Sequence, residues 1–407
     1  MGDIRRAIMR NSINARIFSP GREVYIVGGY LRDSLTGRKT KDIDYIVRGD
    51  IKDFACQLLV QEGGKRKEQK LLDGATIVEL KKEQMIRIVL KNGMTIDFTE
   101  LKDSLEDNLR ERDFTMNALA WSPQTGLIDP FNGVKDIEKE RIKAISIDNF
   151  INDPLRLLRV YRFIAELGWD VDSKTRKMVR QLNGAIERPA SERITLEFFK
   201  LLDSENYHNA LEMAFKDGLL ESFLSISHKK LAENIKTLPA LESTLKKLPS
   251  RFENNLEKPF SQELTYRGLL RLEHVLGGSI LNKNRLRLSR LILERLKIVN
   301  KLLTTIYYSL STAPKMFDTF FKAKDALFDI LILTGNIKHL NQAERFKKIW
   351  KKSFLTADEI MDITKLGEGI ELGKLIYRLK KMQFEGKLKS KKDAVRWIKK
   401  AYRVQKF

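Results

Sequence analysis

The spacing of apolar residues changes once along the 407-residue chain, near residue 135. Before that point, β-rich segments with period-two alternation, such as 42–47, are mixed with short helical ones. After it, apolar residues recur every three or four positions, which predicts helices. The pattern predicts an α+β fold, with a head built from a mixed sheet and helices, followed by an all-helical remainder. The clearest helical segments are 154–167, 191–202, 209–223 and 286–309.

The same patterning predicts the elements of the head. The pair Gly28-Gly29 marks the end of a first strand, because adjacent glycines commonly interrupt regular structure. Polar segments between the other elements are typical of turns. Strands are expected at 23–27, 42–47, 75–80, 84–90 and 94–98, and helices at 30–35 and 51–62.

The chain has a formal net charge of +22, and most of it lies in the second half. Residues 205–407 contain 40 basic and 22 acidic residues, whereas residues 1–204 contain 36 and 32. The last stretch, 374–407, has 13 basic residues and 2 acidic ones. This asymmetry favours the capture of nucleic acid, and a solvated lysine-rich surface is the alternative.

No segment provides the ~18–20 consecutive apolar residues of a membrane-spanning helix. The N-terminal residues lead into no apolar core of a secretory signal, and Cys56 is the single cysteine. One cysteine excludes an intramolecular disulfide and a cysteine-rich zinc site. We therefore expect a cytoplasmic protein with no membrane partner.

Two carboxylates, Asp42 and Asp44, lie at alternate positions of one predicted strand and so face the same side. Carboxylate oxygens are the ligands that Mg²⁺ prefers, and two such ions can activate a hydroxyl and stabilise a leaving phosphate oxygen. Asp97, on another predicted strand, suits the role of a third carboxylate, and Glu100 is a weaker candidate. Exposed strand carboxylates are the alternative for the isolated motif.

The glycines Gly28 and Gly29 stand directly before the first predicted helix, whose first turn carries Arg32 and Asp33. Glycines allow close approach of a triphosphate, and Arg32 could add a two-point phosphate contact. The alternative is a tight turn in which Arg32 pairs with Asp33. Together with the Asp-x-Asp strand, the segment predicts nucleotidyl transfer to a hydroxyl, and the Walker pattern of P-loop ATPases is missing.

These segments resemble a known family. Residues 27–38 (VGGYLRDSLTGR), followed by 42–44 (DID), resemble the head motif of bacterial tRNA nucleotidyltransferases and poly(A) polymerases, which belong to the polymerase β-like superfamily. Similar segments follow in the family's order over nearly the full chain. They are the second motif at 112–118, the hinge at 129–133, the nucleotide-selecting motif at 153–163, the neck helix at 191–197 and the tail at 366–373 and 385–386.

The resemblance implies a polymerase β-like head followed by helical neck, body and tail. The head would be catalytic, the neck would select the nucleotide and the basic tail would bind tRNA at its acceptor arm and elbow. The implied boundaries are 1–135 for the head, 136–204 for the neck, 205–310 for the body and 311–407 for the tail.

The resemblance also implies roles for residues outside the first motif. Arg112, Asp113 and Asn117 of the second motif would contact the ribose and triphosphate. Asp153 and Arg156 would read the base, and no nucleic-acid template would be used.

The selecting pair has a chemical rationale. Asp153 can accept from an exocyclic amine and Arg156 can donate to ring acceptors, so the pair suits cytosine or adenine and rejects uracil and guanine. Three residues apart on a helix, they would share a face. Arg159 and Arg162 would continue it, either contacting phosphates or bracing Asp153. A salt-bridged amphipathic helix is the alternative.

Three departures from the family pattern matter. Asn152 stands where the family usually has Glu, so we expect altered fine positioning rather than lost activity. Glu111 stands where the family usually has Arg, and Arg110 would compensate only partly. Only 99–105 separates the third-carboxylate strand from the next helix, where enzymes that add all of CCA carry a flexible loop. The short segment favours a CC-adding enzyme, unless another loop such as 63–74 performs the switch.

The expected partners are thus tRNA, CTP and possibly ATP, with Mg²⁺ as cofactor and a separate A-adding enzyme acting afterwards. Full CCA addition, and A addition or poly(A) synthesis, stay open as alternatives. A catalytically silent RNA-binding protein is the alternative from another class.

Overall fold

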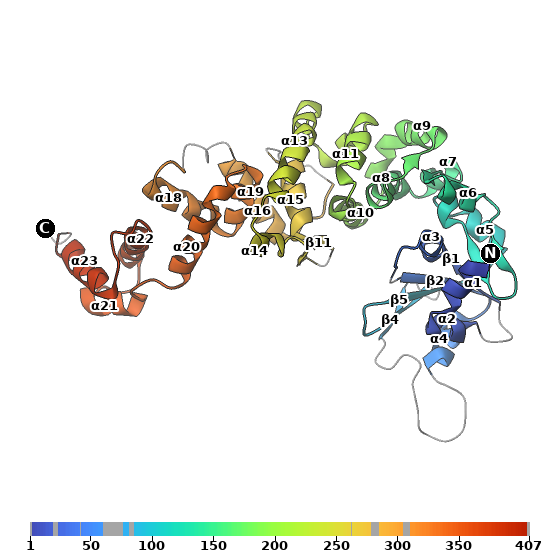
Figure 1. Ribbon diagram of the computed structural model, residues 1–407, viewed down its shortest axis with the longest axis horizontal. Coiled ribbons are helices and arrows are strands. Elements are labelled where there is room, and N and C mark those ends of the chain that lie inside the picture. Colours follow the sequence, from blue (N-terminus) through green and yellow to red (C-terminus); the bar gives the residue numbers. More distant parts are fainter. Residues whose placement is uncertain are drawn as a thin grey trace, which may run out of the picture. The chain divides into compact units, whose positions relative to one another are not determined.

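A computed structural model describes residues 2–18, 23–40, 42–59, 76–80, 85–261, 263–277, 285–303 and 310–404. The chain folds into two compact units, Met1–Phe223 and Leu224–Phe407 (Figure 1). The first unit contains a mixed sheet with helices, and the second is almost entirely helical, which confirms the α+β class. The predicted four-part division at 135, 204 and 310 remains a prediction.

The first unit is built on a seven-stranded sheet in the order β3-β4-β5-β2-β1-β6-β7. β2 and β5 are parallel, and the other neighbours in this sheet are antiparallel. All five predicted strands are confirmed, and two strands of three residues were not predicted. The bounds are β1 Val24–Val27, β2 Asp42–Val47, β3 Thr76–Leu80, β4 Met85–Val89, β5 Thr95–Glu100, β6 Ala120–Ser122 and β7 Gly126–Ile128.

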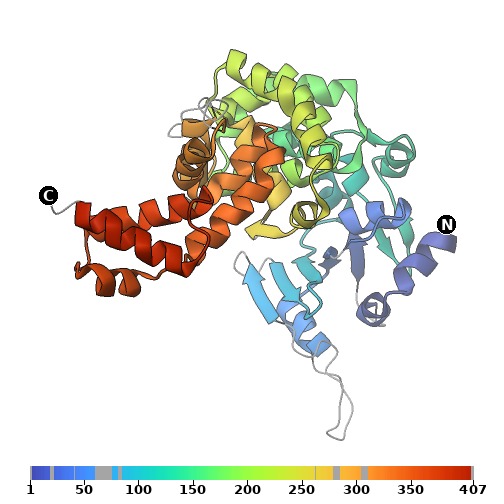
Figure 2. The same cartoon turned by 60° about the vertical axis from the view of Figure 1, so that its left-hand side comes forward.

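The two faces of the central strands differ in chemistry. Tyr45 of β2 lies opposite Phe98 of β5, and their rings stack with centroids 5.4 Å apart. Phe54 of α4 (Ile51–Leu59) packs edge-on against Phe98 at 5.4 Å, and Figure 2 shows α4 beneath these strands. The opposite face carries Asp42 and Asp44 of β2 and Asp97 of β5. One face therefore anchors the sheet, and the other is left for polar chemistry.

Helices complete the first unit. The central one is α8, whose Leu157, Leu158, Val160 and Ile164 are buried between α10 and α11. A short parallel pair of strands, β8 (Arg141–Ile142) and β9 (Asp170–Val171), was not predicted. The helices are α1 Gly2–Met9, α2 Ser12–Ile17, α3 Gly29–Leu35, α5 Leu105–Arg110, α6 Gly133–Glu138, α7 Ile147–Asn152, α8 Leu155–Leu167, α9 Ser173–Leu182, α10 Ser191–Asp203, α11 Tyr207–Lys216 and α12 Leu219–Leu224.

Two of the predicted helices have bounds in the structure that differ from those expected from the sequence. The expected helix at 209–223 is divided into α11 and α12, because Gly218 adopts a positive φ of 74° that ends the first of them. The expected helix at 286–309 begins at Arg290, where Ser289 accepts from the Ile292 amide as its cap. Residues 304–309, 60–62 and 63–74 lie outside the described residues.

The second unit packs around two apolar clusters. One joins α13, α15, α16, α18, α19 and α20, and the other joins α21, α22 and α23. Trp397 and Tyr402 pack against the second cluster, so they anchor the last helix. The bounds are α13 His228–Lys246, α14 Ser250–Glu253, α15 Tyr266–Val275, α16 Arg290–Leu302, α18 Ala313–Ala323, α19 Leu327–Leu333, α20 Leu340–Lys351, α21 Ala357–Thr364, α22 Ile370–Phe384 and α23 Lys391–Val404, with strands β10 Pro259–Ser261 and β11 Leu264–Thr265.

Within the described ranges, no helix combines the length and apolar character that crossing a membrane would require.

Candidate active site

A cavity of about 520 Å³ in the first unit gathers the predicted site residues. Its walls come from the turn between β1 and α3, from β2, β4 and β5, from the segment after α5, and from α8. Six further lining residues were not predicted: Tyr30, Thr40, Arg87, Phe163, Glu166 and Lys200. All fourteen predicted residues line it: Gly28, Gly29, Arg32, Asp33, Asp42, Asp44, Asp97, Arg112, Asp113, Asn117, Asp153, Arg156, Arg159 and Arg162.

The acidic wall is formed by Asp42 and Asp44 of β2 and Asp97 of β5. Asp44 lies directly opposite Asp97 in the parallel register. Burial raises the pKa of the Asp44 carboxyl, the charge of Arg112 opposes this, and the charges of Asp97 and Asp42 add to it. A cation would relieve this repulsion, and the carboxylate oxygens of Asp42 and Asp44 are a donor set that suits Mg²⁺.

Asp97 already has a partner. Arg87, which lies opposite it on β4, donates from Nε to Oδ1 at 2.8 Å and from Nη2 to Oδ2 at 2.6 Å. Glu100, the other candidate for a third carboxylate, does not line the cavity. Across the described ranges, no three acidic, histidine or cysteine side chains are grouped as metal ligands. The described donors for a metal are therefore Asp42 and Asp44.

The turn after β1 brings backbone close to the acidic wall. Gly28 has a φ of 74°, a conformation that L side chains rarely adopt. A Cβ there would lie 3.2 Å from Nη1 of Arg112 and 3.4 Å from Oδ2 of Asp44. The backbone angle favours glycine here, and an added Cβ would also crowd the Arg112 side chain.

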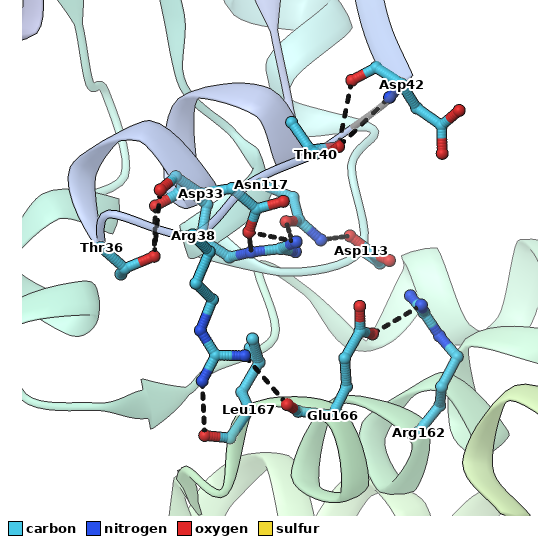
Figure 3. Close-up of polar contacts among 11 residues, drawn as sticks. Asp33, Thr36, Arg38, Thr40, Asp42, Asp113, Asn117, Arg162, Glu166 and Leu167 are labelled. Carbon is cyan, nitrogen blue, oxygen red and sulfur yellow. Dashed lines mark hydrogen bonds and ion pairs between the residues drawn. The ribbon is translucent and has the colours of Figure 1, made fainter. Parts of the chain in front are cut away.

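A chain of polar contacts runs from α3 to the second motif (Figure 3). Arg32 donates from Nε to Oδ1 of Asp33 at 2.9 Å and from Nη1 to Oδ1 of Asn117 at 2.9 Å. Asn117 in turn donates to Oδ1 of Asp113 at 2.9 Å. The alternative predicted for Arg32, a pair with Asp33, does form. Burial raises the pKa of Asp33, and the charge of Arg32 opposes the rise.

Asp113 is the centre of this network. Its carboxylate is buried and accepts from Nε of Arg159 at 2.8 Å and from its neighbour's amide, Phe114 N–H, at 2.8 Å. Burial alone would raise its pKa, but the charges of Arg159 and Arg156 and the hydrogen bonds from Asn117 and Phe114 lower the pKa to about 2. Asp113 therefore fixes the second motif to α8.

The structure corrects the placement of the selecting pair. Asp153 is not on a helix: it lies between α7 and α8 with φ −133° and ψ 89°, and Pro154 follows it. Arg156 is in the first turn of α8. Burial lowers the pKa of Arg156, against the charges of Asp113 and Asp153. Asp153 and Arg156 still line the same cavity.

Of the two roles left open for Arg159 and Arg162, phosphate contact or bracing of Asp153, the structure corrects the bracing. Arg159 pairs with Asp113, and Arg162 forms ion pairs with Glu166 at 2.9 Å and Glu197 at 2.8 Å. The side chain that holds Asp153 is Arg193 of α10, which donates to its Oδ2 at 2.9 Å. Arg193 belongs to the segment that resembles the supporting neck helix, and this resemblance could have indicated its contact with the site.

Phe163 was also missed as a contributor to the basic wall. The guanidinium carbons of Arg162, Arg32 and Arg159 lie 3.9, 5.1 and 5.5 Å from the centroid of its ring. The negative face of an aromatic ring attracts such cations. One buried ring thus helps to hold three arginines at one wall of the cavity.

Comparison with known proteins agrees with the sequence motifs. Residues 24–143 match the family described as "Poly A polymerase head domain", and residues 168–240 match "Probable RNA and SrmB- binding site of polymerase A". The CC-adding tRNA nucleotidyltransferase of Synechocystis sp. is 36% identical over 202 residues, which make up 49% of this chain and 46% of that protein. The CCA-adding enzyme of Leuconostoc mesenteroides is 30% identical over 213 residues, 51% of this chain and 53% of that protein.

The matched segments thus span about half the length of these relatives. The likeness in structure extends further. The Thermotoga maritima CCA-adding enzyme complexed with tRNA superposes with a TM-score of 0.75 over 98% of both chains, at 19% identity, which establishes the fold. Together with the motifs of the head, these matches show that residues 24–143 and 168–240 correspond to the head and RNA-binding domains of the poly(A) polymerase family, and that the chain is similar to bacterial tRNA nucleotidyltransferases.

Proposed function

We propose that the chain is a template-independent tRNA nucleotidyltransferase that adds C residues from CTP to the 3′ end of tRNA. One observation carries the proposal. The cavity brings the acidic pair Asp42 and Asp44, the glycine turn at Gly28 and the base-reading pair Asp153 and Arg156 to one place. Phosphate transfer and base selection can then act on a single nucleotide.

The lining residues would have different roles, according to their place in the cavity. Arg32 and Arg112 would neutralise the triphosphate beside the glycine turn. Asp153 would accept from the exocyclic amine of cytosine, and Arg156 would donate to its ring acceptors. The 3′-hydroxyl of tRNA would lie near the carboxylates of Asp42, Asp44 and Asp97. Bound Mg²⁺, held by Asp42 and Asp44, would supply charge stabilisation at the phosphate oxygens.

In the reaction, the 3′-oxygen forms a bond to the α-phosphorus and the bond from that phosphorus to the bridging oxygen breaks. Pyrophosphate leaves, and the hydroxyl proton passes to solvent. Asp113 and Asn117 would contribute by holding Arg159 and Arg32 in place at the cavity wall. Asp113 and Asn117 would therefore act on the nucleotide largely through Arg159 and Arg32.

The CC-adding specificity is supported by the connection between β5 and α5. β5 ends at Glu100 and α5 begins at Leu105, where Ser104 accepts from the Asp107 amide as the cap. Four residues leave no room here for the switching loop of CCA-adding enzymes. One relative matched above is named CC-adding and the other CCA-adding, so full CCA addition is the alternative.

The basic second half of the chain, residues 205–407 with a net charge of +18, would bind tRNA through phosphate contacts. A separate A-adding enzyme would then complete the end, and the cytoplasm is the expected location. Poly(A) synthesis is the second candidate function, because the matching head family is described by that activity.

The test is Mg²⁺-dependent release of pyrophosphate from CTP in the presence of tRNA that lacks its 3′ CCA. Asp42→Ala is expected to abolish release while tRNA binding persists. Release by Asp42→Ala at the wild-type rate would contradict the catalytic role. Absence of release by the wild-type protein would instead favour the silent RNA-binding alternative.

A further inference from the structure

The segment that follows α3 reaches the far end of α8 through one side chain. Arg38 donates from Nη1 to the carbonyl oxygen of Glu166 at 2.9 Å and from Nη2 to that of Leu167 at 3.1 Å. Figure 3 shows both contacts at the last turn of α8. The partners are 128 and 129 residues away in the sequence. Arg38 does not line the cavity, so the proposed chemistry leaves it without a role.

The contact completes the C-terminal end of α8. Carbonyl groups in the last turn of a helix have no partner inside the helix and carry partial negative charge. Gly168, with φ 74°, ends α8 and donates its N–H to the carbonyl of Ile164 at 2.9 Å. Arg38 supplies donors for the carbonyls of Glu166 and Leu167. A cation is the favourable charge at this end of a helix.

Arg38 is itself held at a fixed turn. Gly37 has a φ of 71°, and the Arg38 N–H donates to the carbonyl of Asp33 at 2.9 Å. The Thr36 N–H donates to the carbonyl of Arg32 at 3.0 Å, which closes the last turn of α3. The same helix carries Arg32 and Asp33 into the cavity. A shift of the Arg38 contact would therefore be transmitted along α3 to the cavity wall.

The other end of α8 carries the base-reading residues. Arg156 lies in its first turn, and Asp153 lies just before it. Near its middle, α8 is tied to the head by the ion pair of Arg159 with Asp113, at 2.7 Å. Arg38 adds another attachment about two turns further along. Arg32 and Phe114 also contact Phe163 near the middle of α8. Arg38 extends these attachments to the C-terminal end of the helix, and attachments at separated points restrain the direction of its axis.

We propose that Arg38 is a positioning residue that sets the angle of α8 to the sheet, and thereby the distance between the base-reading pair and the triphosphate turn. The inference rests on the proposed function and goes beyond it. Arg38 touches no reacting atom and acts through α8. Discrimination between bases depends on hydrogen bonds that align only when base and triphosphate are held at the right separation. Loss of Arg38 should therefore weaken selection.

The experiment compares Arg38→Ala, Arg38→Lys and the control Arg48→Ala in the full chain. Arg48 is an exposed arginine of the same unit that pairs with Glu23 away from the cavity. The readout is kcat/KM for CTP and for UTP with tRNA that lacks its 3′ CCA. In Arg38→Ala the preference for CTP over UTP should fall by about tenfold. In Arg38→Lys this preference should fall less than in Arg38→Ala, because the ammonium keeps a cation at the end of α8, although it cannot reproduce the two-point contact.

A second readout does not depend on activity. Amide hydrogen exchange over residues 160–168 should become faster in Arg38→Ala, with no change in β1 and β2. Arg48→Ala should match the wild type in both assays. Faster exchange throughout the chain of Arg38→Ala would indicate that this variant unfolds. In that case the nucleotide preference and the amide exchange of Arg38→Lys decide whether Arg38 positions α8.

Unchanged nucleotide preference, or unchanged exchange at 160–168, would overturn the role of Arg38. If the wild-type protein added no nucleotide, the proposed function would fall instead. The exchange measurement would then decide alone whether Arg38 holds α8.

Discussion

Arg87 holds both carboxylate oxygens of Asp97, with contacts of 2.8 and 2.6 Å across the β4–β5 pair. The candidate for a third catalytic carboxylate is therefore already neutralised. The same guanidinium lowers the pKa of Asp44, which burial raises. Arg87 thus lowers the pKa of Asp44 and pairs with Asp97, although it is part of no recognised motif.

Arg87→Gln should move the acid limb of the pH profile to higher pH. Its charge lowers the pKa of Asp44, so removing it lets that pKa rise further. Asp44 must be ionised to hold a cation, so activity should be lost at a higher pH than in the wild type. The measurement is kcat/KM for CTP addition across pH, with Arg48→Gln as the control. An acid limb that stays in place or moves down would contradict this assignment.

Asp44→Asn should be inactive yet more stable. A carboxyl whose pKa is raised on folding stabilises the protein when protonated, and this contribution is lost as pH rises through the folded pKa. At pH 7 the buried charge therefore costs stability, and the neutral amide removes that cost. We expect a higher unfolding midpoint without Mg²⁺, and activity lower by about 10³-fold or more.

Asp42→Asn is the matched control for that stability gain. Asp42 is exposed, so its substitution should reduce activity without raising the midpoint. A lower midpoint for Asp44→Asn would show that its charge is needed for folding rather than for cation binding.

Gly28→Ala should lose activity out of proportion to its effect on stability. The new Cβ would lie 3.2 Å from Nη1 of Arg112 and 3.4 Å from Oδ2 of Asp44. Gly93, in the turn between β4 and β5, also has positive φ (78°) but has no atom within 4 Å of an added Cβ. Both alanine variants should lose roughly 1–3 kcal/mol of stability, because a side chain is strained at positive φ. Pyrophosphate release should fall only in Gly28→Ala, and equal losses in both variants would refute the crowding argument.

Asp113→Asn should destabilise the first unit by about 2 kcal/mol at pH 7. The folded pKa of about 2 lies below the ordinary value of 3.8, so the stabilisation is present above about pH 4 and is lost as pH falls towards 2. Urea denaturation at pH 7 measures the effect, with the exposed Asp170→Asn as control. A loss no larger than that of the control would mean that Asp113 does not anchor α8.

Local patterning predicted the head well where elements were long enough to show a period. β2 was predicted with its observed bounds, and α3 and the strands β1, β3, β4 and β5 within two residues. β6 and β7 have three residues each, too few to establish alternation. The position of Asp153 could have been foreseen, because a residue before proline disfavours helical geometry.

The contacts of the arginines could not be foreseen from spacing. Arg87 meets Asp97 through sheet register, and Arg193 meets Asp153 across 40 residues. Arg38 meets α8 across 128 residues. Each of these pairings depends on how elements pack in three dimensions, which a local pattern does not encode. The motifs identified fourteen of the twenty residues that line the cavity, and packing determined their partners.

CC addition is tested by extending tRNA that lacks its 3′ CCA, resolved to single nucleotides, with CTP alone, ATP alone and both. We expect two added C residues with CTP, no addition with ATP alone, and the same stop after two C residues when both are present. Extension to CCA with both nucleotides would contradict the CC-adding assignment and the weight placed on the short β5–α5 connection. Growth with ATP alone would favour A addition or poly(A) synthesis, and no extension under any condition would contradict the nucleotidyltransferase activity itself.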